Sequence, residues 1–236
     1  VTGPPAAPNG TSYLGDGFPL FALDAATGAT KWHVDTDGTV ACSPVVDGST
    51  VYFSGWNGTA HAVWAVNAKT GAVKWSTPLQ SDTTNSLGSP ALDANNVYFG
   101  YDVCHVYAID RSSGPILWHT APCGYISGSP PVSRRSSWFV TLGSGGEWVR
   151  SFDTTTGAKN WAVVADVYAA YSSPAFDSGK LFVVTGKGVV ALNAATGANG
   201  WNYPVFDSLH DPAPAVATGV VYSGVRGTPG RLDDTA

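Results

Sequence analysis

The chain has 236 residues and a formal net charge of −5, and 12% of its residues are charged while 44% are hydrophobic. This composition excludes a disordered acidic tail and a coiled coil, because both need many more charged residues. Lys and Arg are scattered without forming a basic stripe, which argues against a nucleic-acid partner. No apolar run approaches the ~18 residues that would span a bilayer. Glu147 is the only Glu and Met is absent, so the composition favours strands over helices.

The chain begins with Val1, so we expect either that a signal peptide has been removed or that the chain is a fragment. This start and the Ser/Thr-rich, Lys-poor composition predict a secreted or periplasmic protein. Two sequons mark Asn9 and Asn57 as candidate glycosylation sites. Their number is what chance alone would give, so they add little to the prediction of secretion.

Five segments repeat one pattern without gaps: a small residue, an apolar residue, Asp or Asn, two residues, Thr or Ser, Gly, three residues and Trp. The first copy is 21–32, and the others are 64–75, 107–118, 150–161 and 190–201. The final Trp residues follow one another at spacings of 43, 43, 43 and 40 residues. A period of about 40 residues is typical of repeat architectures.

Each repeat contains signals for four short strands, A to D. Strand A follows a Ser-Pro pair such as Ser43-Pro44, and strand B is an apolar run such as Val51-Tyr52-Phe53. Strand C ends at the Asp or Asn, and strand D leads into the Trp. The Asp/Asn-x-x-Thr-Gly stretch predicts a tight C–D turn, in which the polar side chain accepts backbone N–H groups and Gly supplies a positive φ. Four strands at this period predict an all-β fold of the β-propeller class.

The repeated Ala-x-Asp-x-x-Thr-Gly-x-x-x-Trp pattern resembles the tryptophan-docking motif of the pyrroloquinoline-quinone (PQQ) repeat β-propellers, a superfamily similar to quinoprotein alcohol dehydrogenases. The resemblance covers nearly the whole chain. It implies that each Trp packs between neighbouring blades against the Gly turn of the next motif. The implied docking residues are Trp32, Trp75, Trp118, Trp161 and Trp201, with Gly28, Gly71, Gly114, Gly157 and Gly197. The superfamily contains dehydrogenases and also non-catalytic propellers, so the fold alone does not decide function.

The expected domain organisation is a short tail over 1–10, a β-propeller over 11–225 and a second tail over 226–236. Five motif-bearing units favour five four-stranded blades, with the last strand A completing the first blade. That closure leaves the following strand at Val220–Tyr222 without a place, so six blades or a truncated chain stay open as alternatives.

The C–D turns are uniform, so we expect function on the opposite face, where the variable B–C and D–A loops gather. Aromatic rings there, beside Asp and Asn, would suit a carbohydrate. The candidate ligand residues are Trp56, Tyr101, Tyr125, Trp148, Tyr168 and Tyr171. The alternative is that these rings simply pack under the loops.

All three Cys residues fall on the same face. Cys104 and Cys123 are predicted to form a disulfide across one loop, which leaves Cys42 as a buried thiol. The alternative is three unpaired Cys.

The superfamily's alcohol dehydrogenases carry adjacent Cys residues at the quinone and a calcium held by Glu, Asn and Asp. This chain has no adjacent Cys pair, and Glu147 is its only available Glu. We therefore expect no catalytic residue, no cofactor and no metal, and a non-catalytic assembly or recognition module whose partner is a protein or another copy of the chain. A lectin-like propeller that binds glycans is the first alternative, and a fragment of a PQQ-dependent dehydrogenase is the second.

Overall fold

The structure is a computed structural model. It describes residues 6, 8–15, 17–40, 42–79, 88–101, 105–120, 132–133, 138–142, 149–163, 173–185, 188–204, 213–223 and 230–233. In these ranges the strands are joined by turns and short irregular segments, and the one helical element is a 3-10 turn, η1 (Pro8–Gly10). No helix there is long enough to cross a membrane. The chain divides into two compact units, one of Val1–Asp102 with Val106–His119 and one of Val103–His105 with Thr120–Ala236.

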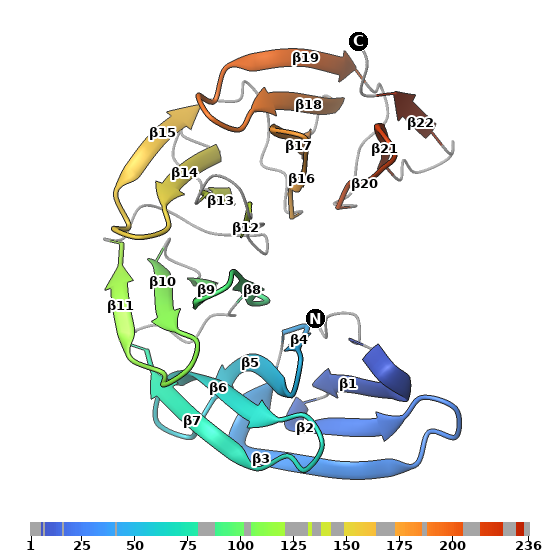
Figure 1. The fold of residues 1–236 in the computed structure, drawn as a ribbon, viewed down its shortest axis with the longest axis vertical. Coiled ribbons are helices and arrows are strands. Elements are labelled where there is room, and N and C mark those ends of the chain that lie inside the picture. Colours follow the sequence, from blue (N-terminus) through green and yellow to red (C-terminus); the bar gives the residue numbers. More distant parts are fainter. Residues whose placement is uncertain are drawn as a thin grey trace. The chain divides into compact units, whose positions relative to one another are not determined.

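The first unit contains three antiparallel sheets in which strands adjacent in sequence are hydrogen-bonded neighbours (Figure 1). The first sheet consists of β1 (Thr11–Gly15), β2 (Gly17–Asp24) and β3 (Thr30–Val40). The second consists of β4 (Val45–Asp47), β5 (Thr50–Trp56), β6 (His61–Asn67) and β7 (Val73–Pro78). The third consists of β8 (Ala91–Leu92), β9 (Asn96–Tyr101), β10 (His105–Asp110) and β11 (Ile116–His119).

The second unit has the same organisation. Its first sheet consists of β12 (Val132–Ser133), β13 (Trp138–Leu142), β14 (Val149–Asp153) and β15 (Lys159–Val163). The next consists of β16 (Ala175–Asp177), β17 (Lys180–Thr185), β18 (Gly188–Asn193) and β19 (Asn199–Pro204). The last consists of β20 (Ala215–Ala217), β21 (Val220–Ser223) and β22 (Gly230–Asp233). The four-strand repeat predicted from the sequence is therefore present in both units.

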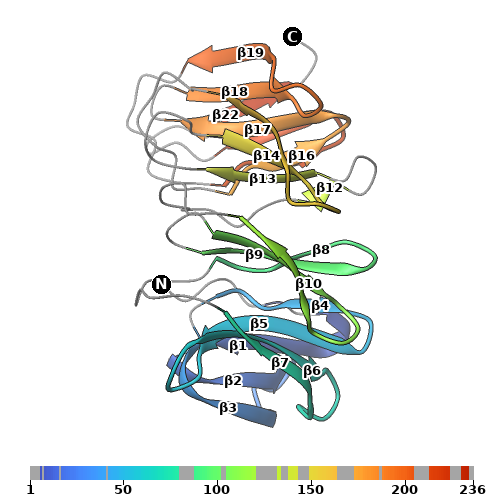
Figure 2. The same cartoon turned by 90° about the vertical axis from the view of Figure 1, so that its left-hand side faces the viewer.

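Neighbouring sheets bury their apolar faces against each other within each unit. In the first unit, Leu20 and Val40 of the first sheet share a core with Val51, Phe53 and other buried residues of the second. Figure 2 shows the strands of these two sheets lying side by side. In the second unit, separate clusters join the sheet β12–β15 to β16–β19, and β16–β19 to β20–β22. The inner strands β5, β6 and β17 are buried along most of their length, so residues on both of their faces are covered.

The small residue of the sequence pattern has a structural reason. In every repeat it is the Cα partner of the repeated Trp across strands C and D, next to a β-bulge. These pairs are Ala22 with Trp32, Ala65 with Trp75, Ala108 with Trp118, Ser151 with Trp161 and Ala191 with Trp201. Directly opposed side chains share one face of a sheet, so a small residue there leaves room for the indole ring.

Both ends of the chain contain β-structure within the ranges predicted as tails. The last A–B pair, β20 and β21, pairs with β22 in a three-stranded sheet. The place of a strand A beside β1 is taken by Ala6, which forms an antiparallel bridge with Tyr13. The described strands thus form six sheets, and β22 and this bridge lie in the ranges assigned from the sequence to tails. The number of blades, five or six, stays a prediction.

Candidate functional site

The C–D turns are built alike in all five repeats. The side-chain oxygen Oδ1 of the repeated Asp or Asn accepts the backbone N–H groups two and three residues later, as the sequence predicted. These caps are Asp24, Asn67, Asp110, Asp153 and Asn193. The Gly four residues after each cap has φ between 72° and 98°, a region that disfavours side chains bearing a Cβ.

Two of the carboxylate caps are held ionised to unusually low pH. The ammonium of Lys31, followed by the N–H and hydroxyl of Thr27, lowers the pKa of Asp24 to about 2. Lys31 Nζ lies 3.2 Å from Asp24 Oδ2. The hydroxyls of Ser112 and Ser113 lower the pKa of Asp110 to about 2 in the same manner. In both turns, donors gathered around the carboxylate favour its charged form.

Trp32 connects the first sheet to the second. Its Nε1 donates to the carbonyl oxygen of Ala68 at 3.1 Å, and its ring lies over Gly71. A Cβ added to Gly71 would lie 2.8 Å from Cε3 of the ring, closer than carbon atoms can pack. This turn therefore needs Gly both for its positive φ and for the approach of the ring.

The same contact occurs at two other places. Trp75 Nε1 donates to Arg111 O at 3.2 Å, and a Cβ at Gly114 would lie 3.0 Å from the Trp75 ring. Trp161 Nε1 donates to Ala194 O at 3.1 Å, and its ring covers Gly197.

The remaining docking residues differ. The expected partner of Trp118 is the turn at Gly157, which belongs to the other unit, so that pairing stays a prediction. Trp201 packs with Val221 and Val216 of the last sheet, yet none of the described residues accepts the hydrogen of its buried Nε1. Gly28 has a positive φ of 73°, but nothing in the described chain lies within 4 Å of an added Cβ.

Sequence reasoning missed an aromatic partner on strand B. Ring pairs at centroid distances of 5.7 to 6.0 Å join this residue to the Trp of its own sheet. They are Tyr13 with Trp32, Tyr52 with Trp75, Tyr98 with Trp118 and Phe182 with Trp201. The hydroxyl of Tyr13 also donates to Ala68 O, at 2.9 Å, so one carbonyl receives both aromatic donors. The signal was present in the sequence as the aromatic residue of each apolar run.

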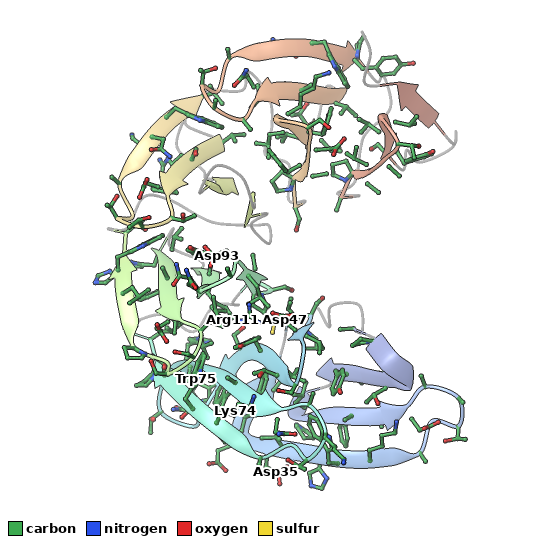
Figure 3. The ribbon with its side chains drawn as sticks, viewed as in Figure 1. Asp35, Asp47, Lys74, Trp75, Asp93 and Arg111 are labelled. Atoms are coloured by element: carbon green, nitrogen blue, oxygen red, sulfur yellow. The ribbon has the colours of Figure 1, made fainter. Side chains whose placement is uncertain are left out.

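Arg111 is the second residue that sequence reasoning passed over. It follows the cap Asp110, at a position where three other repeats have Ala25, Ala68 and Ala194. Its guanidinium forms an ion pair with Asp47, donates from Nη1 to Asp93 O at 2.9 Å, and donates from Nε to the hydroxyl of Tyr52 at 3.1 Å. Figure 3 shows Arg111 between Asp47 and Asp93. The side chain thus links the A–B turns of the second and third sheets.

A polar cleft of about 350 Å³ lies beside Arg111. Its lining residues come from strands B and D of the second sheet and from the A–B and C–D turns of the third. They are Thr50, Tyr52, Lys74, Ala94, Asn95, Asp110, Arg111 and Ser112. The cleft therefore lies at the end of the sheets that carries the C–D turns. These turns are alike in sequence, so function was expected at the opposite end. The substitution of Arg for Ala after the cap is what makes this turn different.

The predicted ligand face is only partly described. Trp56 ends β5 half-buried, in an edge-on contact with the buried ring of His61 at 5.1 Å. Burial lowers the pKa of His61. The side chain of Tyr101, and Tyr125, Trp148, Tyr168 and Tyr171 altogether, lie outside the described residues, so a shared ligand surface stays a prediction.

The structure describes Cys42 and Asn57 but only part of the predicted disulfide and glycosylation sites. Cys42 is a free, buried thiol, as predicted, and burial raises its pKa. Cys104 and Cys123 lie outside the described residues, so their disulfide is still a prediction. Asn57 caps its own turn by accepting the N–H groups of Thr59 and Ala60, whereas the side chain of Asn9 is not described.

Comparison with known proteins identifies the repeats. The profile of the family described as "Outer membrane protein assembly factor BamB" matches residues 1–133 and 145–228. This chain belongs to that family. The predicted superfamily of PQQ-like repeat β-propellers is thereby confirmed, as is the all-β propeller class.

Solved structures support the fold. The structure of BamB from Moraxella catarrhalis has a TM-score of 0.76 and 21% sequence identity, covering 99% of this chain and 72% of that protein. Quinohemoprotein alcohol dehydrogenase ADHIIG from Pseudomonas putida HK5 has a TM-score of 0.68 at 17% identity, over 94% of this chain and 50% of that enzyme. A computationally designed protein, Ika8, has a TM-score of 0.77 at 18% identity, with coverage of 99% and 71%. No curated protein sequence matches the chain significantly.

Proposed function

We propose that this protein is a non-catalytic assembly module that acts in the periplasm by docking another protein. The observation that carries the proposal is the match to the outer membrane protein assembly factor family over most of the chain. The enzymes with similar folds share only the fold at these identities, and the chain spans about half of their length.

The arrangement of the repeated residues supports this proposal. The Trp, Gly and Asp or Asn residues of the pattern are used in contacts that join sheets or cap turns. In the described part of the chain, no group of three or more His, Cys, Asp and Glu is placed to hold a metal. These contacts stabilise the sheets of each unit, and the loops and turns between the strands are left for recognition of a partner.

The proposal is tested by measuring the protein in its native extract. Chemical cross-linking followed by mass spectrometry is expected to join this chain to one defined protein at fixed positions, and size exclusion with light scattering to show that complex above 24.4 kDa. A chain that stays strictly monomeric and cross-links to nothing at any concentration contradicts the assembly role.

The two alternative functions are tested with the purified protein. Titration with PQQ and calcium, followed by dye reduction with alcohols or sugars, is expected to give no turnover. A glycan array is expected to give no saturable signal. Turnover would establish the dehydrogenase alternative, and sugar binding that is lost on substitution of Trp56 or Trp148 would establish the lectin alternative.

A further inference from the structure

The first C–D turn, which joins β2 to β3 (Figure 1), closely matches the fifth. Residues 22–29 read Ala-Leu-Asp-Ala-Ala-Thr-Gly-Ala, and residues 191–198 differ from them only by Asn in place of Asp. Gly28 and Gly197, the glycines of the two turns, have the same φ of 73°. In both turns Oδ1 of the cap accepts the N–H groups two and three residues later. The two turns therefore present the same backbone surface.

The fifth turn is covered by Trp161. The Nε1 of this residue donates to Ala194 O at 3.1 Å, and its ring lies so close to Gly197 that a Cβ there would be 2.8 Å from Cε3. Val163, two residues after the Trp, contacts the same turn, and its Cγ1 would lie 3.1 Å from that Cβ. Ala194 and Gly197 are accordingly buried. The side chains that cover this turn thus come from an extended strand with the pattern Trp-x-Val.

The second and third turns receive strands of the same kind. Trp75 lies over Gly114, and Thr77, two residues after it, donates its hydroxyl to Gly114 O. Trp32 covers the second turn and is likewise followed by Val34, which packs against the core shared by the first two sheets. All three covered turns therefore take a Trp that is followed, two residues later, by a β-branched side chain.

The first turn has no such cover among the described residues. Ala25 and Gly28 are exposed, whereas their equivalents in the fifth turn are buried. In the described chain no N–H or O–H group donates to Ala25 O, and nothing lies within 4 Å of a Cβ added to Gly28. The repeated Trp residues whose packing is described are engaged elsewhere: three lie over other turns, and Trp201 packs against the last sheet. An acceptor and an open glycine surface are therefore exposed in the geometry that holds an indole ring at the other turns.

We infer that the first C–D turn binds a Trp side chain from an extended segment of another protein, with Ala25 O accepting the indole N–H and the ring lying over Gly28. A β-branched residue two positions after that Trp packs beside the ring, as Val163 does at the fifth turn. A docked indole buries roughly 200 Å² of ring surface, whereas a stable dimer needs about 1,000 Å² or more, so the turn fits a short segment better than a second copy of the chain. This inference rests on the proposed assembly function for the partner being a protein, and it names the side chain that the partner supplies.

The test is an NMR titration of the ¹⁵N-labelled chain with the blocked hexapeptide Ala-Lys-Asn-Trp-Ala-Val, the sequence of residues 158–163 that covers the fifth turn. Saturable shifts are expected at the amides of Ala25 and Gly28. The amides of Ala194 and Gly197 are the internal control, and they are expected not to shift because Trp161 already covers that turn. Shifts of equal size at both turns, or at neither, would overturn the inference.

The contribution of the indole is measured with three further ligands. Replacement of Trp by Phe in the peptide removes the N–H donor and is expected to weaken binding roughly fivefold, the loss of one hydrogen bond between neutral groups. Replacement of Trp by Ala is expected to abolish the shifts. N-acetyl-tryptophanamide is expected to bind more weakly than the peptide, because it lacks the strand and the β-branched residue. Shifts with the Ala peptide, or equal affinities for the hexapeptide and either the Phe peptide or N-acetyl-tryptophanamide, contradict a site for a Trp-bearing segment.

The matched variants are Gly28→Ala and Gly48→Ala. The new Cβ of Gly28→Ala would overlap the docked ring, as a Cβ at Gly197 would overlap Trp161, so binding is expected to weaken about tenfold. Gly48 lies in the A–B turn of the second sheet, has φ 56° and has nothing described within 4 Å of an added Cβ. Gly48→Ala therefore introduces a positive-φ strain away from the site, and binding is expected to be unchanged. Equal affinity in the wild type and a folded Gly28→Ala contradicts the site.

Failure of this inference is distinguishable from failure of the assembly function. Cross-linking in the native extract detects a complex wherever its interface lies, so a complex formed by a chain whose first turn binds no peptide overturns the Trp site alone. Light scattering of the purified chain tests the occupant. Self-association that is lost in Gly28→Ala would make a second copy the occupant and overturn the assignment to another protein.

Discussion

Trp32 donates the hydrogen of its Nε1 to the carbonyl oxygen of Ala68, at 3.1 Å, and thereby ties the last strand of the first sheet to the C–D turn of the second. The same geometry joins Trp75 to Arg111 and Trp161 to Ala194. In these three turns the carbonyl oxygen of the residue after the cap accepts the indole N–H. The conformation of the turn and the contact between the sheets therefore depend on each other. A change in either part should therefore weaken both.

The hydrogen bond can be separated from ring packing by comparing two variants. Trp32→Phe keeps an aromatic ring and loses the bond to Ala68, so we expect a loss of about 1 kcal/mol in the free energy of unfolding beyond the cost of the smaller ring. Trp201→Phe is the control, because none of the described residues accepts its Nε1 hydrogen. Urea unfolding of both variants measures the difference, and equal losses would show that the bond contributes nothing.

The Gly turns allow a similar comparison. Gly28→Ala should cost about 1–2 kcal/mol from the positive φ alone, since nothing described lies near the added Cβ. Gly71→Ala carries the same φ cost, and its Cβ would also lie 2.8 Å from the Trp32 ring. We expect a further loss of about 1–3 kcal/mol from this overlap. Thermal unfolding of the two variants checks the order, and an equal loss in both would contradict the close packing of Trp32.

Acid should weaken the first turn through Asp24. Its pKa is about 2 in the folded chain against an ordinary value of 3.8, so the unfolded chain binds more protons between these values. Stability from this group is therefore present above about pH 4 and is lost as the pH falls towards 2. Asp24→Asn keeps the cap, as Asn67 does naturally, and should flatten the loss of stability between pH 4 and 2. Urea midpoints measured across this range test it, and identical slopes in wild type and variant would refute the assignment.

Arg111 and Asp47 should be energetically coupled. A double-mutant cycle with Arg111→Ala and Asp47→Ala is expected to give a coupling free energy of about 0.5–1 kcal/mol, because the Asp47 side chain is half exposed and solvent screens the pair. The same cycle with Arg111→Ala and Asp35→Ala is the control, since Asp35 pairs with His33 instead. A coupling no larger than that of the control would show that the ion pair adds no stability.

The thiols should differ in reactivity. Cys42 is 3% exposed, its sulfur accepts the N–H of Ser54, and burial raises its pKa, so it should resist alkylation until the chain unfolds. Mass spectrometry without reduction is expected to show a peptide cross-linked between Cys104 and Cys123. Three thiols that alkylate rapidly in the native protein would contradict both expectations.

The sequence by itself determined the period of the repeat, the four strands of each repeat and the Asp or Asn caps, because these features depend on local residue pattern and turn chemistry. The spacing of Trp32 and its four equivalents was enough to predict the propeller class. The sequence could not predict that β20 and β21 pair with β22. The choice of a neighbouring strand depends on tertiary contacts, which the pattern of a single strand does not contain.

Only the tertiary structure decided what the third C–D turn does. Arg111 is one residue within a repeated stretch, and its partners Asp47 and Tyr52 come from the preceding repeat. Lys74 and Lys31 are equivalent in sequence, yet one is paired with a carboxylate and the other is not, because the cap is Asp in one turn and Asn in the other. Such differences arise where side chains of neighbouring sheets meet, and a pattern that describes one repeat at a time does not contain them.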